Sequence, residues 1–276
     1  MKTHMLKLFK RSYALYWVLT MLGIIPIAAL IWNNYPIGLL YIIAIPVWMI
    51  IAGMIANIYG VKLTQNMNAT LNDECNTKDF IAFYEKALEK ENINYLRSYI
   101  LLNLSAGYLS SGDFAAGKQI LDMVSRIPDT KDGASHTVCF FNNLAVYYIR
   151  TNELDYAENT LKNLNEALKN PKLDTKYYVR YERLYSFGNV VINVARGNYN
   201  GAEDYLNMLF DKDKTLLMKV SAKYYLGDLY VRLGDPEKAA SAFEYVLQNG
   251  NDTYYAQRAS EYLGKPLITA LPPVKP

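Results

Sequence analysis

The feature that most constrains this chain is a long run without charge near its start. Residues 12–61 contain no charged side chain, although a fifth of the whole chain is charged. A helix needs about 20 mostly apolar residues to cross the hydrocarbon core of a bilayer. Residues 13–32 supply one such run and residues 37–59 supply a second. The Asn-Asn-Tyr-Pro sequence between them favours a turn, because proline disfavours helix in the residue before it. The run therefore predicts a transmembrane helical hairpin over residues 13–60.

The basic residues predict the orientation of this hairpin. Lys2, Lys7, Lys10 and Arg11 lie in the N-terminal flank, residues 1–12, and the turn has no basic residue. Basic flanks stay on the cytoplasmic side and can contact anionic lipid headgroups. We therefore expect a multi-pass membrane protein with two spans, whose N-terminus and C-terminal domain are both cytoplasmic. The alternative is a cleaved signal peptide, for which this apolar region is too long.

Small residues recur in the second apolar run. Ala52, Ala56 and Gly60 are spaced every four residues, which places them on one face of a helix. Small residues let helix backbones approach closely in a membrane. We expect this face to pack against the first span, while a second copy of the protein or another membrane protein are the alternative partners. Because the runs contain no ionisable residue that would mark a transport pathway, we interpret the hairpin as an anchor.

The rest of the chain is close to neutral. It carries 25 basic and 26 acidic side chains, and such a balance argues against a nucleic-acid partner, which usually requires a basic surface. The only cysteines are Cys75 and Cys139, which we expect to be free thiols. Cys75 lies in a polar linker, residues 61–77, and is expected to be accessible.

Internal repeats follow the linker. The clearest unit contains small and aromatic residues at helical spacing: Leu226, Gly227, Tyr230, Gly234, Ala239 and Phe243. Asp235 is a natural N-cap and Pro236 suits the first position of a helix. The unit resembles the tetratricopeptide-repeat (TPR) family, whose signature has Leu-Gly, then Tyr, later Ala and Phe. It departs from that signature at Lys223, where the family often has Trp, and at Asn251, where it often has Pro.

Weaker copies of the unit lie upstream, over residues 104–124, 144–164 and 197–209. The first helix of the third copy matches poorly, because Asn189 and Asn193 fall where the family has Leu and Tyr. The copies are spaced more widely than the family's usual repeat, and loops at 129–135 and 170–174 take the extra residues. Residues 78–91 and 254–263 have the pattern of capping helices. The resemblance implies an all-α fold in which the hairpin precedes a TPR-like α-solenoid, residues 78–263, of about four helix pairs plus capping helices.

Little in the sequence supports catalysis. His136 and Cys139 have a spacing that could supply two metal ligands, but a structural zinc site needs four. We find no phosphate-binding loop and no nucleophile elbow. We therefore expect no metal, no cofactor and no enzymatic activity.

The resemblance also implies a binding groove. TPR modules bind peptides in a concave groove lined by the first helix of each repeat. Carried over to this chain, the groove residues are Tyr99, Leu102, Ala106, Asn142, Val146, Arg150, Phe187, Val191, Tyr224, Asp228 and Arg232. Simple core burial is the alternative for each apolar member. The set is mostly apolar and aromatic, and it lacks the clustered basic residues of family members that bind a C-terminal carboxylate. An apolar peptide segment or an amphipathic helix is the expected ligand.

The C-terminal tail, residues 264–276, contains Pro266, Pro272, Pro273 and Pro276, so it favours an extended form. One hypothesis is that it occupies the groove as a self-ligand.

Together these observations predict a non-enzymatic, membrane-tethered scaffold that binds a peptide or helical segment of a partner protein at the cytoplasmic membrane face. Its expected partners are that protein and the lipid bilayer, with another membrane protein as an open alternative. A peptide-sensing regulator and an enzyme with an unrecognised site are the competing interpretations.

Overall fold

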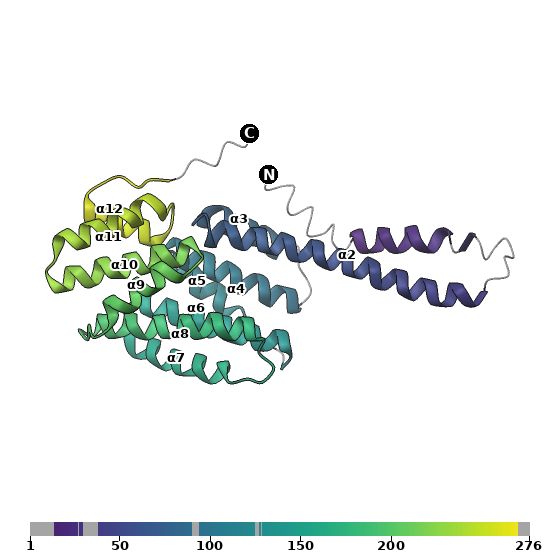
Figure 1. Ribbon diagram of the computed structural model, residues 1–276, viewed down its shortest axis with the longest axis horizontal. Helices are drawn as coiled ribbons and strands as arrows, with labels where there is room; N and C mark the ends of the chain where they lie inside the picture. The colour runs from purple at the N-terminus through teal and green to yellow at the C-terminus, as the bar shows by residue number, and fades with distance from the viewer. Residues whose placement is uncertain are drawn as a thin grey trace. The chain divides into compact units, whose positions relative to one another are not determined.

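Helical periodicity dominates the chain, and the fold that results is all-α. The computed structural model describes residues 14–26, 28–29, 38–89, 94–124, 127 and 129–269, in which helices and connecting turns occur and no strand does (Figure 1). Before α2, the described helical residues are 14–26 and 28–29, which we call the first helix. The helices after it are α2 (Gly38–Asn72), α3 (Thr77–Leu88), α4 (Asn94–Ser111), α5 (Phe114–Asp122), α6 (Lys131–Arg150), α7 (Leu154–Leu168), α8 (Thr175–Ala195), α9 (Ala202–Lys212), α10 (Leu216–Leu233), α11 (Pro236–Asn249) and α12 (Tyr254–Leu263). The chain divides into two compact units, residues 1–69 and 70–276.

In the N-terminal unit, the first helix packs against α2. The indole Nε1 of Trp48 donates a hydrogen bond to the carbonyl oxygen of Leu19, at 2.6 Å. A Cβ on Gly23 would lie only 2.0 Å from the same indole, so the ring requires glycine at that position. Ala52 and Ala56 are buried, whereas the surroundings of Gly60 are outside what the structure describes. Close packing through small residues is therefore present at this hairpin.

The prediction of two membrane spans is wrong. Among the described residues, no helix combines the length and the apolar character that a bilayer crossing demands. The second run does not form a separate apolar helix, because α2 continues without a break into polar sequence as far as Asn72. This finding also contradicts the predicted multi-pass membrane localisation, on which the predicted cytoplasmic orientation depended.

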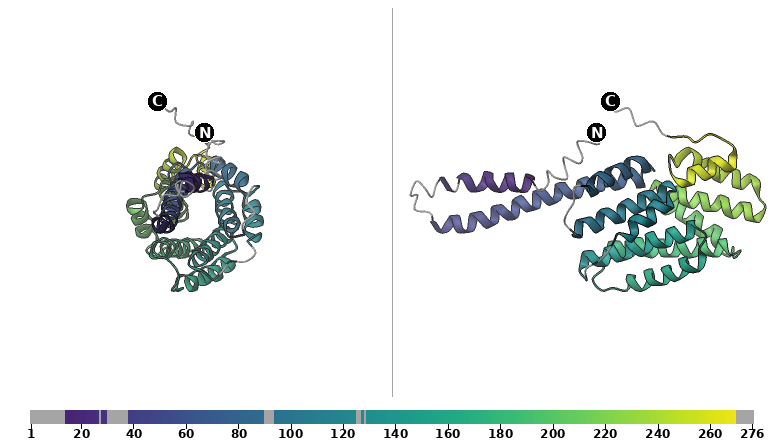
Figure 2. Two further views of the ribbon diagram at one scale, coloured as in Figure 1. Left: turned by 90° about the vertical axis from the view of Figure 1, so that its right-hand side faces the viewer. Right: turned by 180° about the vertical axis from the view of Figure 1, so that it is seen from behind.

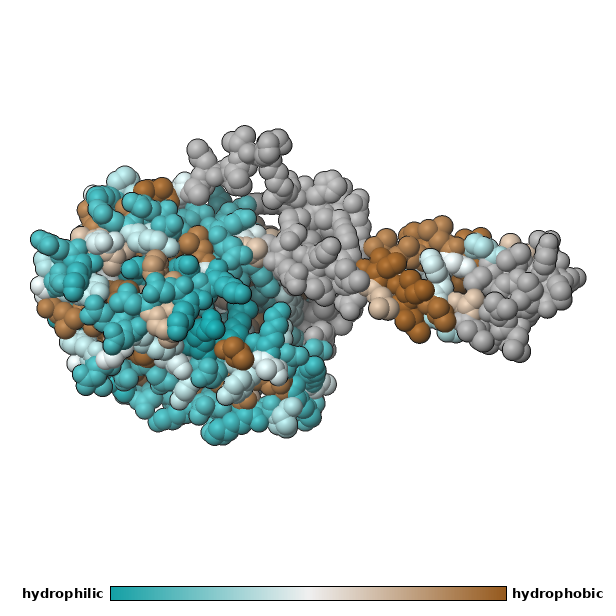
Figure 3. Space-filling model, viewed as in Figure 1, coloured by the Kyte–Doolittle hydropathy of each residue, from teal (hydrophilic) through white to brown (hydrophobic). Residues whose placement is uncertain are grey.

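The surface of the N-terminal unit is nevertheless apolar. Its exposed side chains include Leu22, Ile25, Ile50 and Met54, each about 60% exposed. Figure 3 shows apolar residues gathered there, while hydrophilic residues predominate on the visible face of residues 70–269.

In the second unit, consecutive helices pack as antiparallel neighbours. The pairs α4–α5, α6–α7 and α10–α11 form close hairpins, α3 packs on α4 at one end, and α12 packs on α11 at the other. The predicted capping helices at residues 78–91 and 254–263 correspond to α3 and α12. The predicted loop at 129–135 is shorter than expected, because Thr130 caps α6 and the helix begins at Lys131.

The helices of this unit form an inner and an outer layer. Among the described side chains, α4 has none that is fully exposed, and α6 has none after Asp132. On α10, exposed side chains begin only at Val231. In contrast, α5, α7, α9 and α11 each present a face of exposed side chains. Because α4, α6 and α10 each contact at least three other helices and expose few side chains, we call them the inner layer.

The third pair is irregular. Helix α9 packs mainly against α10 and only slightly against α8, while α8 packs against α6 and α7. The turn between α8 and α9 contains Gly197 and Gly201, both with a positive φ. This break in the pairing coincides with the sequence copy that matches the repeat signature least.

The two ends of the second unit meet, so its helices form a ring (Figure 2, left). The backbone N–H groups of Thr77 and Lys78 donate to the carboxylate of Asp252, at 2.7 and 3.0 Å. The side chain of Asn251 donates to the carbonyl oxygen of Glu74, at 3.2 Å. A second junction joins α12 to α4, where Gln257 donates to the carbonyl oxygen of Ser111. The loop before α12 therefore caps the amino end of α3.

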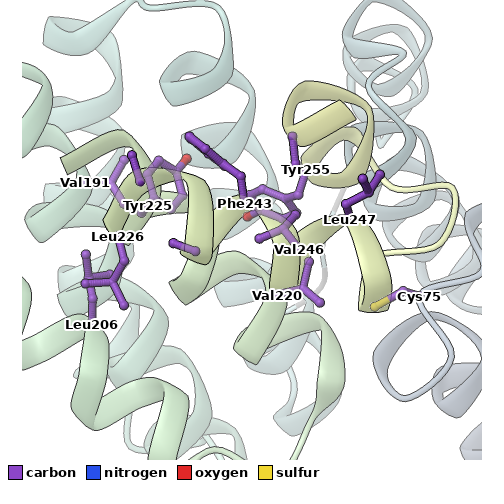
Figure 4. Close-up of a cluster of buried hydrophobic side chains, with 13 residues drawn as sticks. Cys75, Val191, Leu206, Val220, Tyr225, Leu226, Phe243, Val246, Leu247 and Tyr255 are labelled. Atoms are coloured by element: carbon purple, nitrogen blue, oxygen red, sulfur yellow. The ribbon is translucent and has the colours of Figure 1, made fainter. Parts of the chain in front are cut away.

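The largest core cluster lies beside this junction. It combines α8, α9, α10, α11 and α12 with Cys75, which precedes α3 (Figure 4). Cys75 is fully buried, so the prediction that it is accessible is wrong. The reason is ring closure, which places the segment before α3 against Val246 and Leu247 of α11.

Local signals in the last repeat are confirmed. The Asp235 carboxylate accepts a hydrogen bond from the backbone N–H of Lys238 at 3.1 Å, so it is the N-cap of α11, and Pro236 occupies the first helical position. Gly227 lies against the ring of Phe243, where a Cβ would come within 2.7 Å of Cε1. The small residue therefore permits α10 and α11 to pack closely.

Candidate functional site

The predicted groove residues fall into three classes of exposure. Leu102 and Val191 are buried and belong to the core, at 1% and 5% exposure. Arg232 is exposed and pairs with Asp228 at 2.9 Å. The others are half-buried: Tyr99, Ala106, Asn142, Val146, Arg150, Phe187, Tyr224 and Asp228. These half-buried side chains lie on α4, α6, α8 and α10, and they are the accessible part of the predicted set.

One member, Arg150, lies at the centre of an aromatic cluster. Its guanidinium carbon is 4.1 Å from the ring centroid of Tyr255, 4.7 Å from that of Tyr254 and 5.5 Å from that of Tyr225. Tyr224 joins the cluster through ring contacts with all three tyrosines. Arg150 is the last residue of α6, whereas the tyrosines belong to α10 and α12. The cluster thus connects α6 to helices that are far from it along the chain.

Tyr254 extends this cluster to α5. Its ring packs against Phe114 of α5 with centroids 5.1 Å apart. Its side chain also lies over Gly112, where a Cβ would approach it to 3.2 Å. The same tyrosine therefore touches α5 and the turn before it, Arg150 of α6 and Tyr224 of α10.

The charge of Arg150 has no counter-charge within the cluster. Burial raises the pKa of Tyr225, and burial together with Tyr254 raises the pKa of Tyr224 to about 12, so both phenols are neutral at pH 7. Burial acts to lower the pKa of Arg150, but attraction to the four tyrosines at the high pH where they ionise outweighs it, and the pKa lies above its ordinary value. The guanidinium is therefore a cation that the cluster stabilises through cation–π attraction to the tyrosine rings. Each such interaction contributes about 0.5–2 kcal/mol.

The residues considered for metal binding do not form a site in the described chain. His136 is buried beside Tyr99, with ring centroids 6.2 Å apart, and burial lowers its pKa. Burial raises the pKa of the Cys139 thiol. Within the described parts of the chain, no three His, Cys, Asp or Glu side chains are grouped as metal ligands.

The described part of the tail packs on α11. Lys265 pairs with Glu244 at 2.6 Å, and Leu267 lies against the large core cluster. Residues 270–276 lie outside the described residues, so the self-ligand hypothesis stays a prediction.

No protein-family model, curated protein or solved structure matches this chain. The TPR resemblance therefore depends on the residues of the chain and on the helix pairs that they form. Sequence reasoning identified Arg150 as a groove residue but assigned Tyr254 and Tyr255 to a capping helix. Arg150 meets these two tyrosines because the helices close into a ring, and no local sequence pattern predicts that closure.

Proposed function

We propose that this chain is a non-enzymatic scaffold with TPR-like repeats, which binds a peptide or helical segment of a partner protein on its inner helices. The observation that carries this proposal is the layering of the second unit. Helices α4, α6 and α10 each contact at least three other helices, yet Ala106, Val146 and Tyr224 retain part of their surface. Half-buried apolar and aromatic side chains on these helices suit an apolar ligand, because large contact area forms at a small cost in side-chain freedom.

A photocrosslinking experiment tests this proposal. A photoreactive amino acid replaces Val146 on α6, and in a matched control it replaces Tyr156, an exposed residue on α7. In cells that express the full chain, we expect a discrete crosslinked partner from position 146 and none from position 156. Crosslinking from both positions, or only from position 156, would assign binding to the outer layer instead.

The same experiment separates the competing interpretations. A crosslinked protein that co-purifies with the chain supports the scaffold. A crosslinked free short peptide would indicate a peptide-sensing regulator. Turnover of a small molecule by the purified chain, lost on substitution of inner-layer residues, would indicate an enzyme.

A further inference from the structure

Arg150 is a cation without an anionic partner in the described protein. Arg183, Arg196, Arg232 and Arg258 each form an ion pair with a carboxylate, whereas no ion pair or hydrogen bond among the described residues involves the guanidinium of Arg150. Its position at the end of α6 gives it only the partial negative charge of the helix terminus. Removing a guanidinium even partly from water costs free energy unless an anion or hydrogen bonds compensate.

The acidic residues on neighbouring segments do not compensate this charge. Glu153, which follows α6, accepts a hydrogen bond from the hydroxyl of Thr151 at 2.7 Å. Asp228, one turn after Tyr224 on α10, pairs with Arg232. Both carboxylates are therefore engaged elsewhere, and the charge of Arg150 is left available to a ligand.

The N–H donors of Arg150 have no hydrogen-bond acceptor among the described residues, and the side chain is only half-buried. Rings that stack on a guanidinium cover its faces, while its N–H donors point outward in the plane. Tyr225, Tyr254 and Tyr255 hold the group at 4.1–5.5 Å, and Arg150 retains part of its surface. A planar fork of donors held in a fixed orientation matches the paired oxygens of a carboxylate, which it binds through two parallel hydrogen bonds.

We propose that Arg150, framed by Tyr225, Tyr254 and Tyr255, binds a carboxylate of the partner segment. This inference rests on the proposed function, because the carboxylate arrives as part of a segment bound on the inner helices. The carboxylate is an Asp or Glu side chain or the C-terminus of the partner, and these two sources share the same chemistry. The tyrosine rings contact the apolar part of the segment beside it.

The first test measures the anion site without any peptide. The full chain is labelled with ¹⁵N, and the Arg150 Nε–Hε resonance is assigned by its absence in Arg150→Lys. Acetate, inorganic phosphate and chloride are titrated at constant ionic strength. We expect a saturable shift with acetate and none with chloride. No shift with acetate, or an equal shift with chloride, overturns the site, and a stronger response to phosphate overturns its assignment to carboxylates.

The second test uses pools of random hexapeptides and the immobilised full chain. One pool has neutral side chains and an amidated C-terminus, a second has a free C-terminus, and a third is amidated but contains Glu. We expect the wild-type chain to retain one carboxylate-bearing pool about tenfold or more over the neutral pool. The preference should disappear in Arg150→Gln and weaken in Arg150→Lys, which keeps the charge but loses the fork. Arg196→Gln, which removes an arginine that follows α8 and pairs with Asp155 and Glu158, should keep the preference.

The outcomes separate the two proposals. Equal retention of all pools by the wild-type chain overturns the carboxylate site and leaves peptide binding intact. Retention of no pool, together with a specific acetate shift, overturns peptide binding and leaves the anion site intact. The better-retained carboxylate pool identifies whether a side chain or a C-terminus is recognised.

Discussion

The surroundings of a single side chain, such as Cys75, are determined by segments far from it in the sequence. Cys75 sits in a polar stretch of sequence, and its φ of 50° is unusual for a residue other than glycine. Nevertheless it is fully buried against α11. Burial, with a smaller effect from Asp252 and Asp73, raises its pKa from 9.0 to about 12. A residue that sequence places in a linker is therefore part of the core.

This burial predicts low reactivity of the Cys75 thiol. The thiolate is the reactive species, so in a Cys139→Ala background at pH 8 we expect native Cys75 to react with a thiol reagent at least about 100-fold more slowly than in urea. The folded pKa exceeds the unfolded one, so the thiol stabilises the folded state below pH 9, and this contribution is lost as the pH rises toward 12. Equal rates in buffer and in urea would contradict the buried position.

At the scale of helices, glycines set the distances between neighbours. Gly107 lies against Phe80 of α3, Gly188 against Leu161 of α7, and Gly227 against Phe243 of α11. Each pair lets two helix backbones approach more closely than larger side chains would allow. These glycines therefore permit close packing within the pairs α3–α4, α7–α8 and α10–α11.

We predict that Gly227→Ala destabilises the protein by about 1–2 kcal/mol, measured by urea unfolding. Alanine is favoured over glycine in a helix by about 1 kcal/mol, but its Cβ would lie 2.7 Å from a rigid phenyl ring. Ser241→Ala on the exposed face of α11 is the control and should change stability by less than about 0.5 kcal/mol. Adding Phe243→Leu to Gly227→Ala should cost less than the sum of the two single changes, because the clash is removed. Wild-type stability in Gly227→Ala would show that α10 and α11 are not in close contact.

Local elements were predictable from sequence because their signals are local. The N-cap Asp235 with Pro236, and the helix Tyr254–Leu263, follow from residues within or beside the element. The weak packing of α8 against α9 was indicated only indirectly, by Asn189 and Asn193. The apolar run near the start was misjudged, since apolar composition alone does not determine how far a helix extends or where it ends. The Arg150 cluster could not be predicted, because it requires contact between α6 and α12, which are far apart in the sequence.

At the scale of the whole second unit, closure distinguishes this protein from an open solenoid. Stacked repeats normally contact only their neighbours, so their ends are the least stable parts. Here Asp252 bonds to Thr77 and Lys78, residues 175 and 174 positions away in the chain. The first and last helices therefore support each other.

We expect Asp252→Ala to destabilise the unit by about 1–2 kcal/mol, because two backbone donors lose a charged acceptor. Hydrogen exchange should accelerate at both sides of the junction, over residues 75–80 and 250–256. Asp113→Ala is the matched control, since Asp113 caps only α5 through the N–H of Ala116. Its effect should be confined to α5. Acceleration on one side only in Asp252→Ala would show that the two ends are not coupled.

Closure also has a consequence for synthesis. The amino end of α3 leaves the ribosome long before residue 252 is translated. Until then the ring is open, and the backbone N–H groups of Thr77 and Lys78 lack the acceptor that Asp252 supplies. Until the last loop arrives, the inner helices can be approached from the side. After it arrives, the ligand that we propose would reach the inner helices along the axis of the ring or through an opened junction. A partner synthesised at the same time would therefore reach Val146 and Arg150 by a route that the finished protein no longer offers.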